Sequence, residues 1–168
     1  MYKRQAKEDA FRQIFEANSK KIYHLCLGYA GDEDAAHDLL QDTFLKVWQN
    51  LDKFRNQAMI STWIYRIAVN TCLTYLRSEK RQAKEELTPQ LAEIKREELS
   101  EKNEQVALLY KCIAQLEESE RIIITMVLDE VPYPEIAEIS GISEGNLRVK
   151  IYRIKQKLTD LYNHYERL

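Results

Sequence analysis

Six side chains within residues 61–81, "STWIYRIAVNTCLTYLRSEKR", could bind unpaired nucleic-acid bases and phosphates. Their separations of three, four, four, three and four residues place them on one narrow stripe of a helix, which turns about 100° per residue. The stripe consists of Trp63, Arg66, Asn70, Thr74, Arg77 and Arg81. A tryptophan can stack on a base, arginines can bind phosphates, and an amide can hydrogen-bond a base edge. Taken alone, the pattern fits a half-buried tryptophan beside solvated arginines equally well.

A second pattern, "EIAEISGISEGNLRVKIYRIKQKL" at residues 135–158, has the spacing of a helix-turn-helix. The small Ala137 allows close approach of the second helix, Gly141 supplies the positive φ of the turn, and Ile142 fills the space between the helices. Ser143 is a good N-cap for the second helix. The apolar face of that helix is expected to consist of Leu147, Ile151, Ile154 and Leu158.

The open face of the second helix is basic. Between residues 146 and 158 the chain has five basic residues and no acid, whereas acids are found in the preceding segment. A basic helix of this kind suits insertion into the major groove of DNA. An ordinary amphipathic helix with a solvated basic face is the simpler alternative. The candidate DNA-binding residues are Asn146, Arg148, Val149, Lys150, Tyr152 and Arg153.

Composition predicts an all-α protein of two small helical domains. The 168 residues include only 4 Gly and 3 Pro, and we find no run of alternating β-branched residues. Residues 82–104 carry seven Glu against four basic residues, and Pro89 interrupts any helix there. We therefore expect an acidic linker at 83–104 between a domain at 1–82 and a helix-turn-helix domain at 105–168. The formal net charge of −2 gives no indication of a polyanionic partner.

The sequence lacks the patterns of an enzyme, a metal site or a membrane protein. It has no Gly-rich phosphate loop, no secretory h-region and no long uncharged apolar span, so we expect a cytoplasmic protein without a cofactor or a membrane insertion. The cysteines are expected to be buried, reduced thiols rather than disulfide partners or zinc ligands. The scattered residues on which these expectations rest are Cys26, Cys72, Cys112, His24, His37 and His164.

Both patterns together resemble the sigma factors of bacterial RNA polymerase, specifically the small extracytoplasmic-function (ECF) group. The matching stretches are "DAAHDLLQDTFLKVWQNLDKFR", "STWIYRIAVNTCLTYLR" and "EIAEISGISEGNLRVKIYRIKQKL", in the expected order and spacing. The resemblance implies a factor that binds core RNA polymerase and directs promoter-specific transcription initiation. It also implies a protein inhibitor, an anti-sigma factor, as a partner.

The resemblance implies three groups of binding residues. The polymerase's beta-prime clamp helices would contact Asp38, Gln41, Asp42, Leu45 and Gln49, while the second domain would also touch the beta flap. Melting and reading of the minus-10 element would involve the stripe on 61–81 and the preceding loop. Phe54 and Asn70 would belong to a pocket for a flipped-out base, and residues 55–61, which include Arg55 and Asn56, would form its wall. The basic helix of the second domain would read the minus-35 element.

The sequence departs from the family's pattern in two places, at Val149 and in the stretch "EVPYPEI". Val149 replaces a small polar residue, which favours an apolar contact such as one with a thymine methyl group. In "EVPYPEI", Pro132 and Pro134 stand where a glycine-containing turn and a serine cap are more usual, and they are expected to start the helix instead.

Two other functions fit parts of the sequence. A dimeric helix-turn-helix regulator would use the same C-terminal module but would leave the stripe on 61–81 unexplained. A purely protein-binding helical adaptor would treat both basic faces as solvated surface. The sequence does not decide whether the two domains pack together.

Overall fold

The computed structural model describes residues 2–85 and 104–167, and every regular element within these ranges is a helix, as predicted. Residues 86–103, which contain most of the expected acidic linker, lie outside the described residues, so the linker stays a prediction. The helices are α1 (Tyr2–Ala30), α2 (Glu33–Asn50), a short 3-10 helix η1 (Leu51–Lys53), α3 (Ile60–Glu85), α4 (Glu104–Ile113), α5 (Glu118–Leu128), α6 (Tyr133–Ser140) and α7 (Glu144–Glu166).

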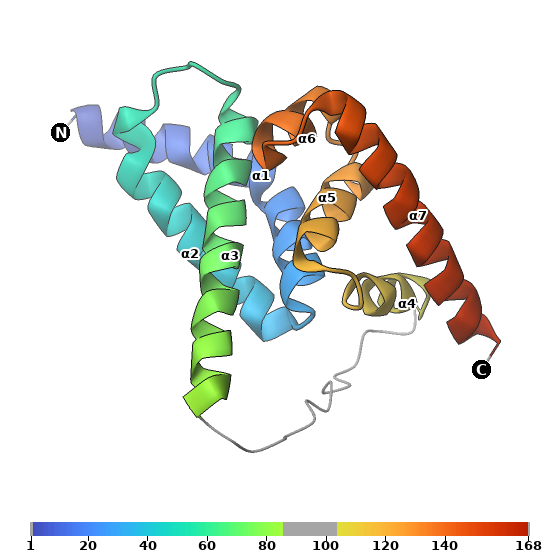
Figure 1. The fold of residues 1–168 in the computed structure, drawn as a ribbon. Coiled ribbons are helices and arrows are strands. Elements are labelled where there is room, and N and C mark those ends of the chain that lie inside the picture. Colours follow the sequence, from blue (N-terminus) through green and yellow to red (C-terminus); the bar gives the residue numbers. More distant parts are fainter. Residues whose placement is uncertain (1, 86–103, 168) are drawn as a thin grey trace.

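Helices α1, α2 and α3 pack on one another and form the first module (Figure 1). The chain reverses at Gly31, whose φ of +71° is accessible to glycine without steric cost. Asp32 then caps α2, because its carboxylate accepts a hydrogen bond of 2.8 Å from the backbone N–H of Ala35. Buried side chains from all three helices fill the space between them, including Leu25, Phe44 and Ile64.

Helices α6 and α7 form the predicted helix-turn-helix. Gly141 has a φ of +69°, and its N–H donates to the carbonyl oxygen of Ala137 at 2.9 Å. The Ser143 hydroxyl accepts from the N–H of Asn146 at the start of α7. Pro132 occupies the N-cap of α6, so the two prolines do start this helix. All four residues predicted for the apolar face of α7 are buried: Leu147, Ile151, Ile154 and Leu158.

The two modules pack together in a closed arrangement, a point that the sequence left open. In Figure 1, α5 and α6 of the second module lie against α1 and α3 of the first, and one continuous apolar core includes residues of both. Gly28 of α1 meets α5 so closely that a Cβ atom at this position would lie 2.4 Å from Oγ1 of Thr125. Arg121 of α5 reaches across and donates a 3.0 Å hydrogen bond to the carbonyl oxygen of Tyr29.

A polar pair lies within the contact between the modules. The Nδ1 atom of His24 lies 2.7 Å from Oδ1 of Asp129, and both side chains are partly buried. The second carboxylate oxygen of Asp129 is buried without a hydrogen-bond partner among the described residues. An unpaired buried acceptor costs about 1–3 kcal/mol. The contact between the modules therefore includes a polar pair as well as apolar packing.

Substituting Gly28 tests the closed arrangement. In Gly28→Ala the added methyl group collides with Thr125, whose hydroxyl is already bonded to the carbonyl oxygen of Arg121 at 2.8 Å. We expect the free energy of unfolding to fall by about 1–3 kcal/mol and the radius of gyration from X-ray scattering to rise. Gly145→Ala is the matched control, because a Cβ atom there meets nothing within 4 Å. If Gly28→Ala and Gly145→Ala had the same free energy of unfolding and the same radius of gyration, the closed packing would be contradicted.

Candidate nucleic-acid interface

The predicted stripe on α3 forms one open edge of the first module. Arg66, Asn70 and Thr74 are exposed, whereas their neighbours Ile64 and Ala68 are buried in the core. The Thr74 hydroxyl donates to the backbone oxygen of Asn70 at 2.8 Å, as is common for threonine in helices. Three of the predicted polar groups therefore lie together on the surface of α3.

The last two members of the predicted stripe are only partly described. Arg77 and Arg81 belong to α3, but their side chains lie outside the described residues. Their contribution to phosphate binding stays a prediction from helical spacing.

An aromatic pair joins the stripe to the preceding loop. The ring of Trp63 is half-buried, and its centroid lies 5.1 Å from the Phe54 ring at an interplanar angle of 38°. Asn56 adopts a left-handed conformation with φ +52°, which asparagine tolerates better than most residues. The side chains of Arg55, Asn56 and Met59 are exposed around this turn. The arrangement offers an aromatic surface bordered by polar groups, which suits stacking and edge recognition of an unpaired base.

The predicted reading face of α7 is largely exposed. Asn146, Arg148, Val149, Tyr152 and Arg153 are all exposed, including the apolar Val149 at 51% and Tyr152 at 63%. Exposed apolar groups can contact base edges in the major groove, and the neighbouring cations can bind the phosphates that flank it.

Lys150 differs from the other members of the predicted face. It is half-buried, and its ammonium group donates to the Ser119 hydroxyl of α5 at 3.1 Å. Lys157 forms a similar link, with its ammonium group 2.6 Å from Oε1 of Glu120, and this hydrogen bond raises the pKa of Lys157. Both lysines connect α7 to α5. The spacing of residues within α7 could not predict these two contacts, because the partners belong to another helix.

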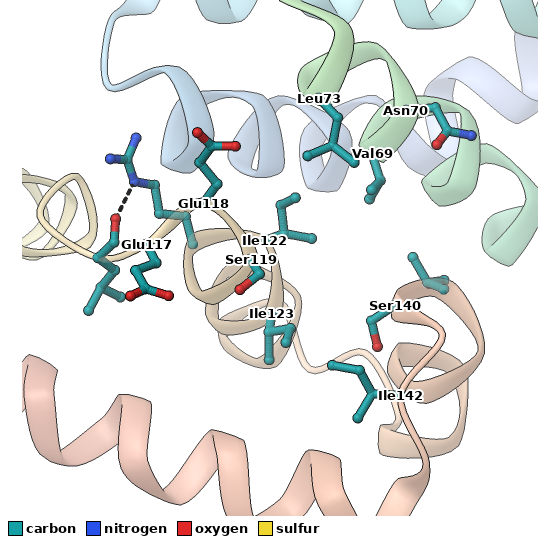
Figure 2. Close-up of a pocket in the computed structure, with 13 residues that line it drawn as sticks. Val69, Asn70, Leu73, Glu117, Glu118, Ser119, Ile122, Ile123, Ser140 and Ile142 are labelled. Atoms are coloured by element: carbon teal, nitrogen blue, oxygen red, sulfur yellow. Dashed lines mark hydrogen bonds between the residues drawn. The ribbon is translucent and has the colours of Figure 1, made fainter. Parts of the chain in front are cut away.

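The closed arrangement directs the stripe on α3 toward the helix-turn-helix. The Arg66 guanidinium is paired with the carboxylate of Glu138 in α6 at 2.8 Å. Asn70 lines a groove of about 920 Å³ between α3 and the second module. Figure 2 shows Val69, Asn70 and Leu73 across this groove from residues of the second module, including Ser140 and Ile142. The stripe is therefore not fully available to DNA in this conformation.

The five residues predicted to contact polymerase are all exposed on α2. They are Asp38, Gln41, Asp42, Leu45 and Gln49. The first four surround a shallow depression of about 510 Å³, to which Leu39 and Tyr75 also contribute. Leu45 is 53% exposed, so this depression has an apolar rim beside two carboxylates. An apolar anchor surrounded by polar groups is a common composition for protein-binding surfaces.

The three cysteines are free and buried, as predicted. The hydrogen bond between Cys26 and Cys72, together with burial, raises the pKa of the Cys26 thiol well above its ordinary value. Burial also raises the pKa of Cys112. A raised pKa lowers the fraction of the reactive thiolate at any given pH.

These thiols should be inert in the folded protein. At about pH 8 we expect alkylation of Cys26 and Cys112 by iodoacetamide to be at least tenfold slower than in the denatured chain, because burial and the raised pKa both reduce reactivity. Mass spectrometry of the native and the denatured protein measures this difference. Rapid native alkylation would contradict the burial of these side chains.

Comparison with known proteins matches both modules. The sequence model of the family described as Sigma-70 region 2 matches residues 14–82, and that of Sigma-70, region 4 matches residues 107–158. The ECF RNA polymerase sigma-E factor of Escherichia coli K12 is 31% identical, over 90% of this chain and 85% of its own. The ECF RNA polymerase sigma factor SigW of Bacillus subtilis is 29% identical, over 92% of this chain and 91% of its own.

Two solved structures share the fold. The sigma factor RpoE of Bartonella quintana, in complex with the anti-sigma factor NepR, superposes with a TM-score of 0.77 at 19% identity, over 92% of this chain and 97% of the other. CnrH, in complex with the cytosolic domain of CnrY, gives a TM-score of 0.67 at 21% identity, over 94% of this chain and 90% of the other.

A region 2 module followed by a region 4 module defines a sigma-70-type transcription initiation factor, which is a DNA-binding protein and not an enzyme. More specifically, the chain belongs to the ECF RNA polymerase sigma factors. Among the described helices, none combines the length and the apolar character needed to cross a membrane.

Proposed function

We propose that this chain binds core RNA polymerase in the cytoplasm and directs it to initiate transcription at specific promoters. The observation that carries the proposal is the presence, on one chain, of an exposed polar stripe beside an aromatic pair and an exposed basic helix-turn-helix helix. These features lie within the region 2 match and the region 4 match, respectively.

The first module opens the minus-10 element by capturing one strand. Unpairing and flipping a base costs a few kcal/mol. Stacking on an aromatic surface such as the Phe54–Trp63 pair returns about 1–3 kcal/mol per base, and Asn70 bonds a base edge. Arg66 holds the backbone of the captured strand and provides part of the salt-dependent affinity. Melting then follows from selective binding, without ATP hydrolysis by this protein.

The second module reads the minus-35 element with α7. Arg148 and Arg153 are the candidates for contacts with guanine or phosphate, and Val149 provides an apolar contact for a thymine methyl group. The N-terminal residues of a recognition helix usually contact the base edges in this motif. Lys150, which is bonded to Ser119, acts at the margin of this face and not at its centre.

Protein partners use the remaining exposed surfaces. The depression around Leu45 on α2 docks on the clamp helices of the beta-prime subunit, and α5 with its neighbours contacts the beta flap. The closed arrangement opens on the polymerase, because the Arg66–Glu138 pair and the groove at Asn70 compete with promoter DNA. An anti-sigma partner would hold the chain inactive; the solved RpoE structure of the same fold is itself a complex with an anti-sigma factor.

Run-off transcription tests the proposal. Core polymerase is incubated with a pool of genomic promoter fragments, with and without this protein. New transcripts that require the chain, and that decrease with Asn70→Ala, support the proposal. A lack of new transcripts, together with tight binding of the protein alone to a palindromic site, would instead support a dimeric helix-turn-helix regulator.

A further inference from the structure

The Pro132-Tyr133-Pro134 sequence holds an aromatic ring at the start of α6. Pro132 is the N-cap residue, with φ −57° and ψ 139°, and Tyr133 is the first residue of the helix. Each proline fixes its own φ, and the missing N–H of Pro134 costs nothing in the first turn of a helix, where it would have no intrahelical partner. The Tyr133 side chain is half-buried and packs against the apolar core. Its position is therefore determined by both the backbone and the packing.

Arg148 of α7 lies over this ring. The centre of its guanidinium group is 5.2 Å from the ring centroid of Tyr133, which is within the range of a cation–π interaction. The same guanidinium group is paired with the carboxylate of Glu144, one turn earlier, at 2.8 Å. Nevertheless, 61% of the Arg148 side chain remains exposed. The group is restrained by two contacts while much of its surface remains open to a ligand.

The two restraints differ in kind. Glu144 and Arg148 lie on the same helix, so their pair moves with α7 and is an exposed contact of small strength. Tyr133 belongs to α6, and its ring approaches the guanidinium from the other helix of the motif. A planar guanidinium group that rests on an aromatic face has fewer accessible orientations than a free one. Tyr133 therefore defines the direction in which Arg148 points.

We propose that Tyr133 is a positioning residue for base reading by Arg148, an inference that rests on the proposed role of α7 at the minus-35 element. An arginine that is already oriented loses less conformational freedom when it bonds guanine bidentately. The ring thus increases discrimination at the single base pair that Arg148 reads. This role would explain why "EVPYPEI" departs from the usual family pattern: the two prolines start the helix that carries Tyr133, and the ring of Tyr133 orients Arg148.

Base preference tests this role separately from overall stability. Holoenzyme assembled from core polymerase and the chain is bound to promoter duplexes in which each minus-35 base is varied in turn. Tyr133→Leu is expected to reduce discrimination at one position by about two- to fivefold, the range of an exposed cation–π contact. Tyr133→Phe, which keeps the aromatic face, should retain the wild-type preference. Thermal unfolding of both variants checks the fold, and Tyr133→Met replaces Tyr133→Leu if the latter does not fold.

A double-mutant cycle completes the test. If Tyr133 acts through Arg148, Tyr133→Leu has no further effect on base preference in an Arg148→Ala background. Additive effects, or an equal loss of affinity for all duplexes, would overturn the inference. If the wild-type holoenzyme shows no preference at any minus-35 base, the proposed reading role of α7 itself fails. Wild-type discrimination that persists unchanged in Tyr133→Leu refutes only the role of the ring.

Discussion

Replacing Arg148 and Arg153 together by alanine is expected to reduce transcription from minus-35-dependent promoters by about 30-fold or more. Both side chains are exposed on the open face of α7, and a specific arginine–base contact contributes about 1–3 kcal/mol. The loss should be measured in run-off assays with core polymerase at several salt concentrations. If one of the two arginines binds phosphate, the variant also shows a shallower dependence of affinity on salt.

The control for this variant removes the same charge elsewhere. Lys20→Ala with Lys21→Ala deletes two exposed cations from α1, so the change in net charge is identical. We expect its transcription to remain within about twofold of wild type, because exposed charges distant from the DNA are largely screened by salt. Equal losses in the two double variants would mean that α7 acts through general charge and not through base reading.

Replacing Leu45 by glutamate is expected to weaken binding to core polymerase by at least about tenfold. Leu45 is 53% exposed and forms the apolar rim of a depression that also contains Asp38 and Asp42. A buried apolar anchor at the centre of an interface typically contributes about 2 kcal/mol or more, and a third carboxylate adds repulsion and a desolvation cost. Fluorescence anisotropy with labelled protein and unlabelled core polymerase measures the affinity directly.

Val106→Glu is the matched control for Leu45→Glu. Val106 is an exposed apolar residue on α4, outside the depression on α2. This control should bind core polymerase with nearly wild-type affinity. If Leu45→Glu also retained full affinity while folding normally, polymerase would dock on another surface and the assignment of α2 would be wrong.

Local patterns were sufficient to predict the helix-turn-helix. Gly141 and Ser143 act through their own backbone or through immediate neighbours, so their roles follow from residue type and spacing. The exposure of Arg66 and Asn70 on α3 follows in the same way from helical periodicity. The fold class and the open faces were therefore accessible from the sequence alone.

Contacts between distant parts of the chain were not accessible in this way. The pairs His24–Asp129 and Arg66–Glu138 join residues that are 105 and 72 positions apart, and no periodic pattern relates them. The spacing of four residues between Glu144 and Arg148 could have indicated their ion pair. By contrast, the approach of Tyr133 to Arg148 depends on the angle between α6 and α7, which only the folded structure defines.

Closure of the two modules has a direct consequence for initiation. In the closed arrangement Arg66 is paired with Glu138, and we propose that promoter DNA displaces this internal partner when it binds α3. Given the proposed role of α3, we expect closure to lower promoter engagement by the free protein until polymerase opens the chain.

The most direct measurement is permanganate footprinting of a promoter identified by run-off transcription, in a complex without nucleotides. With core polymerase and the wild-type chain, we predict reactive, unpaired thymines around the minus-10 element. Asn70→Ala should reduce this reactivity about tenfold, whereas Lys20→Ala with Lys21→Ala on α1 should preserve it. A fully paired minus-10 element in the presence of the wild-type chain, at a promoter that the complex occupies, would contradict strand capture by the first module.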